Sequence, residues 1–299
     1  MKDRLISFLD KYPYPASAKA ELCAALERLE PLPDFIAHVH AYDSGEDIDW
    51  LAATDGVRAA AERTGVHEYT AKLLFSCLLA EPLRRRYLAR GIDEGVWYDT
   101  MRDLYVKYLE CMEVEGVCGS FVAYWFGRLF DLRLFALGRL EFEPAKSTGA
   151  SRTLHGVTLE DGVTDVLNVH IPSGGRLPHE DVLDAYKRAY AFFPQFIQNG
   201  VLPLQCNSWM LYPGLEQFLP ESSNIIRFKR DYTLTVVNSD TAFKNCWRLY
   251  GVRYAGDPKA LPRDSSLRRG YADWIAAGGT PGTAVGFALF DGEKIIKTP

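Results

Sequence analysis

The segment Asp165–Pro178, DVLNVHIPSGGRLP, has the clearest potential for chemistry in this sequence. It predicts a strand that ends at Pro172, a small-residue loop, and a helix with Pro178 at its first position. Glycines let backbone N–H groups approach a ligand closely, and a helix start adds amides and the positive end of a dipole. We therefore predict a pyrophosphate cradle formed by Ser173, Gly174, Gly175, Arg176 and Leu177.

Other features of the same segment leave a second interpretation open. Arg176 adds a charge with the fork geometry that suits phosphate. Glu180 and Asp181, however, lie in the first helical turn and also complement the dipole. The segment has neither the G-K-[ST] of a P-loop nor a G-x-G-x-x-G pattern. An ordinary glycine turn before a helix is the alternative.

His170 lies near the carboxyl end of the predicted strand, two residues before the loop. A histidine beside an anion-binding loop is well placed to act as a general base. The other interpretation is a hydrogen-bonded core histidine, which needs no ligand.

The stretch Gln205–Trp209 lies on the next predicted strand, which a helical crossover makes a neighbour of the His170 strand. Alternation sends Cys206 and Ser208 to one side and Gln205, Asn207 and Trp209 to the other. A nucleophilic pair of Cys206 with His170 is conceivable. A buried inert thiol is the alternative for Cys206.

The elements that carry these residues follow from hydrophobic periodicity. Residues 1–133 are predicted to be helical throughout, including an aromatic-rich helix over Ser120–Leu134. The pattern changes near Leu134, where LFALGRLEFE alternates as strands do. A hairpin over RTLHGVTL and DVLNVHIP, a helix ending in YAFF, a fourteen-residue strand NIIRFKRDYTLTVV and a terminal Asp-Gly hairpin follow. We predict an α+β protein with an all-helical N-terminal domain, 1–133, and a mixed-sheet domain, 134–299.

Composition excludes several classes of protein. The chain has 299 residues, of which 47% are hydrophobic and 24% charged, with a net charge of −5. This is globular composition, and the net charge disfavours binding to nucleic acid or an anionic membrane. The N-terminus lacks the apolar region of a signal peptide, so we expect a cytoplasmic protein. Six cysteines without a C-x-x-C pair predict reduced thiols, and His38 and His40, spaced as on a strand, lack partners for a metal site.

Several segments together resemble the GNAT-like C-terminal domain of bacterial two-domain acyltransferases, which follows a helical N-acyltransferase N-terminal domain. They are LFALGRLEFE, VHIPSGGRL, CNSWMLYPGLEQFLPESSNIIRFKRDY and, more weakly, HEYTAKLLFSCLLA and RRRYLARGI. Relatives usually have Cys-His-Ser-Trp where this chain has Cys206-Asn207-Ser208-Trp209. The Q/R-x-x-G-x-G/A loop signature of GNAT enzymes is replaced by Ser-Gly-Gly-Arg.

The resemblance implies a fold and a reaction. Residues 166–171, ending at Ile171, correspond to the fourth GNAT strand, Ser173–Leu177 to the CoA loop and Leu204–Leu211 to the fifth strand. Acyl-CoA or acetyl-CoA is the implied co-substrate, and a small-molecule amine is the implied acceptor, which attacks the thioester directly. His170 is then the base candidate and Tyr212, after the fifth strand, the acid candidate. Two alternatives stay open: a non-catalytic GNAT-like module that binds a small ligand, and a thiol hydrolase that uses Cys206.

Overall fold

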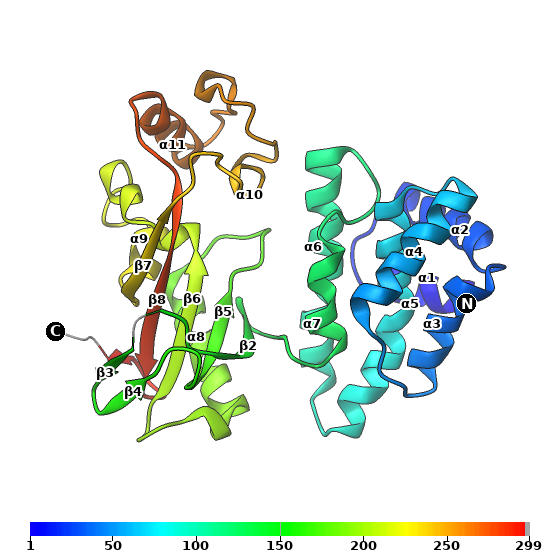
Figure 1. Cartoon of the computed structure of the whole chain (residues 1–299), viewed down its shortest axis with the longest axis horizontal. Coiled ribbons are helices and arrows are strands. Elements are labelled where there is room, and N and C mark those ends of the chain that lie inside the picture. Colours follow the sequence, from blue (N-terminus) through cyan, green and yellow to red (C-terminus); the bar gives the residue numbers. More distant parts are fainter. Residues whose placement is uncertain (150, 297–299) are drawn as a thin grey trace. The chain divides into compact units, whose positions relative to one another are not determined.

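The chain forms two compact units, Met1–Phe135 and Ala136–Pro299. We describe a computed structural model, which covers residues 1–149 and 151–296 (Figure 1). The first unit is built from helices and the second from strands and helices, so the predicted α+β class is confirmed. None of the helices in these residues is long and apolar enough to cross a membrane.

The first unit is organised around α5 (Glu68–Ala89). This helix contacts α1, α2, α3, α4 and α6, and residues 73–80 are buried without interruption. A helix that is apolar on all sides is stable only between neighbours, which explains its central place. Pro82 lies inside α5 without ending it. The other helical elements are α1 (Lys2–Leu9), α2 (Ala16–Leu29), α3 (Pro33–Asp43), α4 (Trp50–Thr64), α6 (Glu94–Glu115), η1 (Ala123–Phe126) and α7 (Gly127–Phe130).

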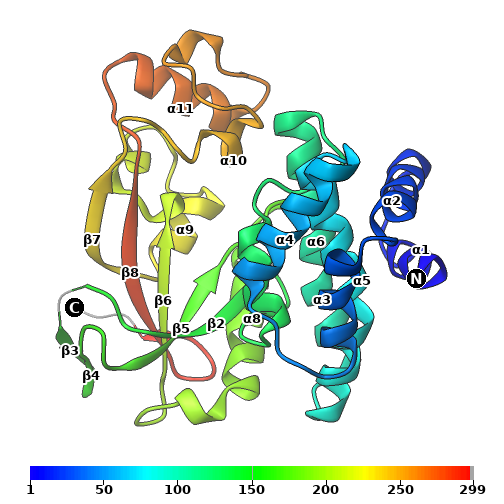
Figure 2. The same cartoon turned by 45° about the vertical axis from the view of Figure 1, so that its right-hand side comes forward.

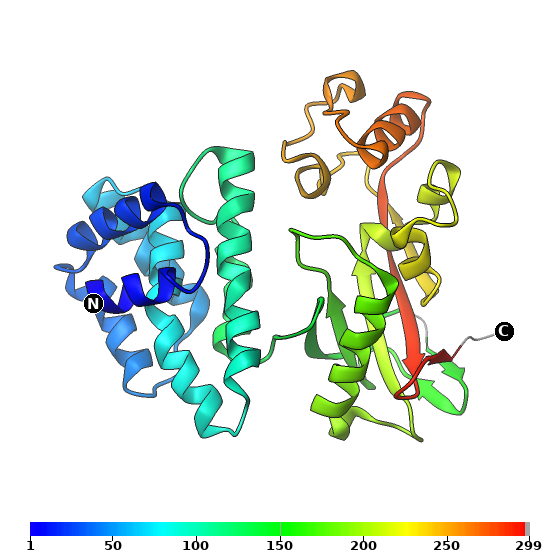
Figure 3. The ribbon, with the colours of Figure 1, turned by 180° about the vertical axis from the view of Figure 1, so that it is seen from behind.

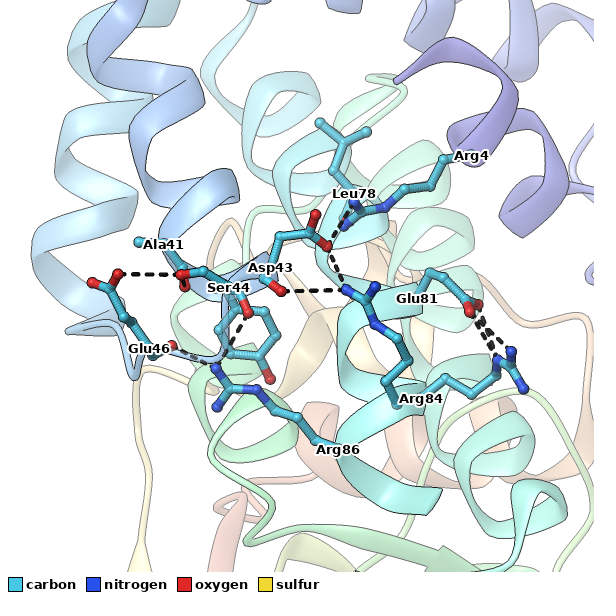
Figure 4. A network of polar contacts seen from close by, with 11 residues as sticks. Arg4, Ala41, Asp43, Ser44, Glu46, Leu78, Glu81, Arg84 and Arg86 are labelled. Carbon is cyan, nitrogen blue, oxygen red and sulfur yellow. Dashed lines mark hydrogen bonds and ion pairs between the residues drawn. The ribbon is translucent and has the colours of Figure 1, made fainter. Parts of the chain in front are cut away.

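A polar network joins α1 and α5 to the end of α3 (Figure 4). Asp43 accepts from Arg4 at 3.0 Å and from Arg85 at 2.6 Å, while Arg86 reaches the carbonyls of Tyr42 and Glu46. Each guanidinium in this network has a carboxylate or carbonyl partner. The cluster therefore ties helices together and is not a free cationic surface.

One sequence prediction in the first unit is wrong. Ser120–Leu134 is not one helix but the short elements η1 and α7. The Trp50 indole explains this, because it donates to the Ala123 carbonyl at 3.0 Å and packs where a Cβ on Gly127 would clash at 2.9 Å. His38 and His40 lie on helix α3, so they do not have the strand spacing considered above.

The second unit contains a mixed sheet in the order β1-β2-β5-β6-β8-β7, with β9 paired to β8. Figure 2 shows the strands β7, β8, β6, β5 and β2 fanned side by side in that order. The pairs β2–β5, β6–β8, β7–β8 and β8–β9 are antiparallel, whereas β5 and β6 are parallel and joined through helix α8 (His179–Phe192). The strands are β1 (Phe135–Leu137), β2 (Leu140–Lys146), β5 (Asp165–His170), β6 (Leu202–Ser208), β7 (Thr233–Ser239), β8 (Gly282–Phe290) and β9 (Ile295–Ile296).

Helix α8 covers one face of this sheet (Figure 3). Tyr186 on α8 packs against Phe142 of β2, with ring centroids 6.4 Å apart, and against Phe290 of β8, at 5.7 Å. Apolar strand residues on this face form one part of the core, and Val166, Phe287 and Leu289 on the opposite face pack with the β3–β4 hairpin. At the far ends of β7 and β8 lie α10 (Cys246–Tyr250) and α11 (Ser266–Ala276) (Figures 1 and 2). The short 3-10 elements of this unit are η2 (Pro194–Phe196), η3 (Trp209–Leu211), η4 (Pro213–Gln217) and η5 (Pro258–Ala260).

The predicted hairpin of RTLHGVTL with DVLNVHIP is also wrong. Its first part is itself a hairpin, β3 (Arg152–Leu154) with β4 (Val157–Leu159), while β5 pairs with β2 and β6. The terminal Asp-Gly hairpin is confirmed, since β8 and β9 pair across the turn after Phe290.

The fourteen-residue strand predicted from Asn224 is a second error in this unit. Its first part is helix α9 (Asn224–Lys229), and β7 begins only at Thr233. Ile226 joins a buried cluster with Leu215 and Tyr271, so tertiary packing decided a segment whose apolar pattern fits both periods.

Candidate functional site

The strands β5 and β6 separate at the centre of the sheet. In the described chain they pair only at Leu167 with Leu204 and at Asn168 with Gln205. Beyond this point β5 continues to His170, while β6 continues to Ser208 paired with β8 on its other side. The facing edges of the two strand ends therefore do not bond to one another. Such edges carry backbone groups that an extended ligand can pair with.

Arg139, which lies in the turn between β1 and β2, binds the loop after β5 through two hydrogen bonds. Its Nε donates to the Arg176 carbonyl at 2.8 Å and its Nη2 to the Gly175 carbonyl at 3.3 Å. In a trans peptide the N–H points opposite to the C=O. Arg139 therefore turns the amides of Arg176 and Leu177 away from itself. Gly174 has φ +86°, a left-handed conformation that favours glycine.

Helix α8 begins directly after this loop. Its N-cap is Pro178, and among the described residues no side chain caps it. The first residue, His179, is fixed by Asp231, whose two carboxylate oxygens lie 3.0 Å from Nε2. Asp231 follows α9, so this contact anchors the start of α8 to a second element. The predicted strand, loop and helix start are thus found together, with Ser173 half-buried, Leu177 buried, and Gly174 to Arg176 exposed.

The face of the sheet opposite α8 carries a row of polar side chains, which we call the polar face. In the register of β2, β5 and β6, Glu143 lies beside Asn168 and Asn168 lies beside Gln205. On each strand, a side chain two residues before or after these lies on the same face of the sheet. Its members are Glu141, Glu143, Asn168, His170, Gln205 and Asn207. Gln205 is satisfied by Thr148, whose backbone amide donates to its Oε1 at 2.7 Å. Asn207 is exposed and lies beyond the point where the strands separate.

His170 and Glu143 form a pair on the polar face. The His170 Nε2 lies 3.1 Å from Glu143 Oε2, and the two side chains are 19% and 10% exposed. Because a carboxylate only accepts hydrogen bonds, Nε2 carries the proton and Nδ1 carries the lone pair. The Asn168 Nδ2 lies 3.2 Å from the same Nε2. Because both nitrogens then carry protons, a hydrogen bond here requires the Asn168 amide to be turned so that its oxygen faces Nε2.

Glu143 is the candidate site residue that sequence reasoning missed. The alternation of LEFE marked it as outward-facing, but nothing in the sequence gave the register of β2 against β5. In that register Glu143 lies opposite Asn168, two residue pairs from the Glu141–His170 pair and on the same face. It supplies the orienting group for the imidazole that the sequence lacked.

Cys206 does not join His170. Alternation places it on the α8 face, opposite the polar face, and its side chain is fully buried. Burial raises the pKa of the Cys206 thiol well above its ordinary value. The structure therefore gives Cys206 the surroundings of an inert core thiol, and the pair conceivable from sequence is not formed.

Tyr212 follows η3 and lies in the wall of a cavity at the end of β6. Its hydroxyl is 3.4 Å from Ser239 Oγ. Lys229 and Asp231 lie at the end of α9 and just after it, where they pair with Glu216 and His179. In the described residues there is also no group of three or more His, Cys, Asp or Glu that could hold a metal ion.

This geometry can be compared with known proteins. A sequence model described as GNAT-like C-terminal domain matches residues 134–288, and one described as N-acyltransferase N-terminal domain matches residues 3–132. The chain belongs to the GNAT-like C-terminal domain family. At the family level it is an acyl-transferring enzyme, and the resemblance drawn from the sequence is confirmed. A search of curated proteins finds no match.

Solved acyltransferase structures have the same fold. One, in complex with decanoyl-CoA and teicoplanin, is 25% identical with a TM-score of 0.75, over 95% of this chain and 87% of the other. A variant acyltransferase in complex with octanoyl-CoA is 24% identical with a TM-score of 0.75, over 99% and 88%. A third, in complex with decanoyl-CoA, is 23% identical with a TM-score of 0.74, over 99% and 88%.

Proposed function

We propose that this protein transfers an acyl group from acyl-CoA to the amine of a small-molecule acceptor. The separation of β5 and β6 after Asn168 and Gln205 is the observation that carries the proposal. It leaves strand edges for the pantetheine arm beside a loop whose amides suit a diphosphate. The acyl-CoA complexes of the similar acyltransferases support the same assignment.

The cofactor side of the site is assigned to the strand end and the loop. Ile171 directly follows the strand, and Ser173, Gly174, Gly175, Arg176 and Leu177 surround the diphosphate. The amides of Arg176 and Leu177 are directed away from Arg139, and the N-terminal end of α8 adds a positive dipole. Arg176 is exposed and adds a positive charge at the same place. Both acetyl-CoA and longer acyl-CoA molecules carry this diphosphate, so the loop does not select the acyl group.

His170 is the proposed general base. The acceptor nitrogen attacks the thioester carbonyl, the new C–N bond forms, the C–S bond breaks, and CoA leaves as a thiolate. The proton lost by the amine goes to Nδ1 of His170, directly or through a water, while Glu143 holds Nε2–H. Asn207 is an amide and cannot accept this proton, so we assign it to hydrogen bonding with the acceptor. Tyr212 stays the candidate acid for the thiolate.

Isothermal titration with CoA, acetyl-CoA and octanoyl-CoA tests the cofactor assignment. We expect saturable binding of all three, with free CoA competing against the acylated forms. Incubation of the octanoyl-CoA complex with a panel of primary amines, read by mass spectrometry, then tests transfer. Absence of CoA binding refutes the proposal. Binding without transfer to any amine favours the non-catalytic binding module instead.

A further inference from the structure

Arg139 is held beside the loop after β5 by its own neighbours in the chain. Gly138 has φ +77°, and a Cβ on it would lie 3.4 Å from the Asp184 carboxylate and 3.6 Å from the Ala185 Cα of α8. Leu140, on the other side, is fully buried. The turn between β1 and β2 therefore packs against α8, the helix into which the loop leads.

The loop has little in its own sequence that fixes its conformation. Gly174 and Gly175 are adjacent, and glycine has a wider choice of backbone angles than any other residue. The end of the loop is anchored where His179 pairs with Asp231, at 3.0 Å. Before that point, the two hydrogen bonds from Arg139, at 2.8 and 3.3 Å, hold the loop to the turn between β1 and β2.

These two bonds determine where the amides of Arg176 and Leu177 point. Each carbonyl that accepts from Arg139 belongs to a peptide group whose N–H, on Arg176 or Leu177, lies on the opposite side. Among the described residues neither N–H donates to a backbone carbonyl, and Leu177 is only 6% exposed. Buried backbone N–H groups are nearly always paired. The two amides are therefore suited to donate to the oxygens of a bound anion.

The guanidinium charge also acts through these peptide groups. A hydrogen bond from a charged donor is stronger than one between neutral groups, and it polarises the peptide group that accepts it. The N–H on the far side of that group becomes a better donor to an anion. Because the N–H groups of Arg139 form a planar fork, one side chain serves two neighbouring carbonyls at once.

We propose that Arg139 is a positioning residue for the diphosphate of acyl-CoA. The proposal rests on the function proposed above and adds to the cofactor site a residue that lies outside the loop. Arg139 fixes the loop before CoA arrives, so that binding does not have to order two adjacent glycines. Its loss therefore lowers the affinity for CoA and leaves the fold intact.

Titration of CoA into the wild type, Arg139→Met and Arg139→Lys measures this effect. Arg139→Met removes every donor, and we expect its Kd for CoA to rise about 10- to 30-fold from the loss of two charge-assisted hydrogen bonds. Arg139→Lys keeps the charge, but an ammonium group does not reproduce the fork, so its Kd should still rise about fivefold or more. Thermal denaturation should give nearly the same Tm for all three, and the lysine variant carries the test if Arg139→Met does not fold.

Arg188→Met is the matched control for charge. Arg188 lies on α8, pairs with Asp184 at 2.7 Å and is 56% exposed, and a Cβ on Gly138 would lie 3.5 Å from its Cδ. The same charge is thus removed from the same region without the loss of a bond to the loop. We expect CoA affinity to change less than about twofold, because exposed charges are screened by salt.

Dephospho-CoA shows which part of the ligand Arg139 serves. It keeps the diphosphate and lacks the phosphate on the ribose, so Arg139→Met should weaken its binding by the same factor as that of CoA. A loss confined to CoA would place Arg139 at the ribose phosphate and would overturn the proposal.

Three other results overturn it as well. Wild-type CoA affinity in folded Arg139→Met shows that the loop does not need this residue. Wild-type affinity in Arg139→Lys, or an equal loss in Arg188→Met, shows that positive charge alone is sufficient. Failure of CoA to bind the wild type refutes the proposed function itself, and this outcome is distinct from all the others.

Discussion

Substitution of Gly174 by alanine separates a diphosphate cradle from an ordinary glycine turn. Gly174 has φ +86° in an exposed loop. A left-handed backbone costs a residue with a Cβ about 1–2 kcal/mol. An exposed loop relieves this strain by moving, so the free protein loses little stability. Binding of CoA must then restore the original conformation, and the cost appears as lost affinity.

The expected loss follows directly from this cost. Since about 1.4 kcal/mol corresponds to a tenfold change in Kd, Gly174→Ala should weaken CoA binding about 5- to 30-fold. Isothermal titration with free CoA measures it without any knowledge of the acceptor, and thermal denaturation should give a nearly unchanged Tm.

Gly162→Ala is the control for this experiment. Gly162 is also exposed, has φ +72°, and has no atom within 4 Å of an added Cβ, but it lies in the turn before β5. The same backbone strain is therefore introduced away from the loop, and CoA affinity should not change. If folded Gly174→Ala protein binds CoA as tightly as the wild type, the loop does not hold the diphosphate.

Three further predictions concern the proposed general base His170, the cysteine thiols and the packing around Tyr212. His170→Ala should abolish most acyl transfer. Glu143→Gln should lower kcat about 10- to 150-fold, because a hydrogen bond to a charged group is worth about 1.5–3 kcal/mol. An altered Kd for CoA in Glu143→Gln would instead indicate a structural role for Glu143. Iodoacetamide at pH 8 should modify Cys23, which is half-buried, whereas the other five cysteines are buried. It should spare Cys206, because burial raises the pKa of the Cys206 thiol and little thiolate forms. Rapid labelling of Cys206 in peptide mapping would support the thiol hydrolase alternative. Gly282→Ala should lower the free energy of unfolding, measured by urea titration, by about 1–3 kcal/mol, because the new methyl group overlaps the Tyr212 ring. An unchanged unfolding midpoint would contradict that packing.

Local patterns in the sequence were sufficient for the parts of the site that are continuous in the chain. The strand, loop and helix of residues 165–192 follow from alternation, two glycines and Pro178, and each signal is read within a few residues. The parallel neighbour β6 also follows, because a strand–helix–strand crossover brings the second strand beside the first. The change from helical to alternating periodicity near Leu134 indicated the all-helical and mixed-sheet parts for the same reason.

Everything that depends on register or on competition between packings was decided only by the tertiary structure. Glu143 reaches His170 because β2 pairs with β5 in one register, and a shift of one residue would have turned its carboxylate to the other face. Asn224–Lys229 became a helix because Ile226 fills a cluster built from distant segments. The cavity at the end of β6 forms only where Tyr212, Val237 and Trp274, which are distant in the sequence, come together. Sequence thus determined the strand, loop and helix of residues 165–192, while long-range contacts, whose energies no local pattern contains, determined which side chains face one another.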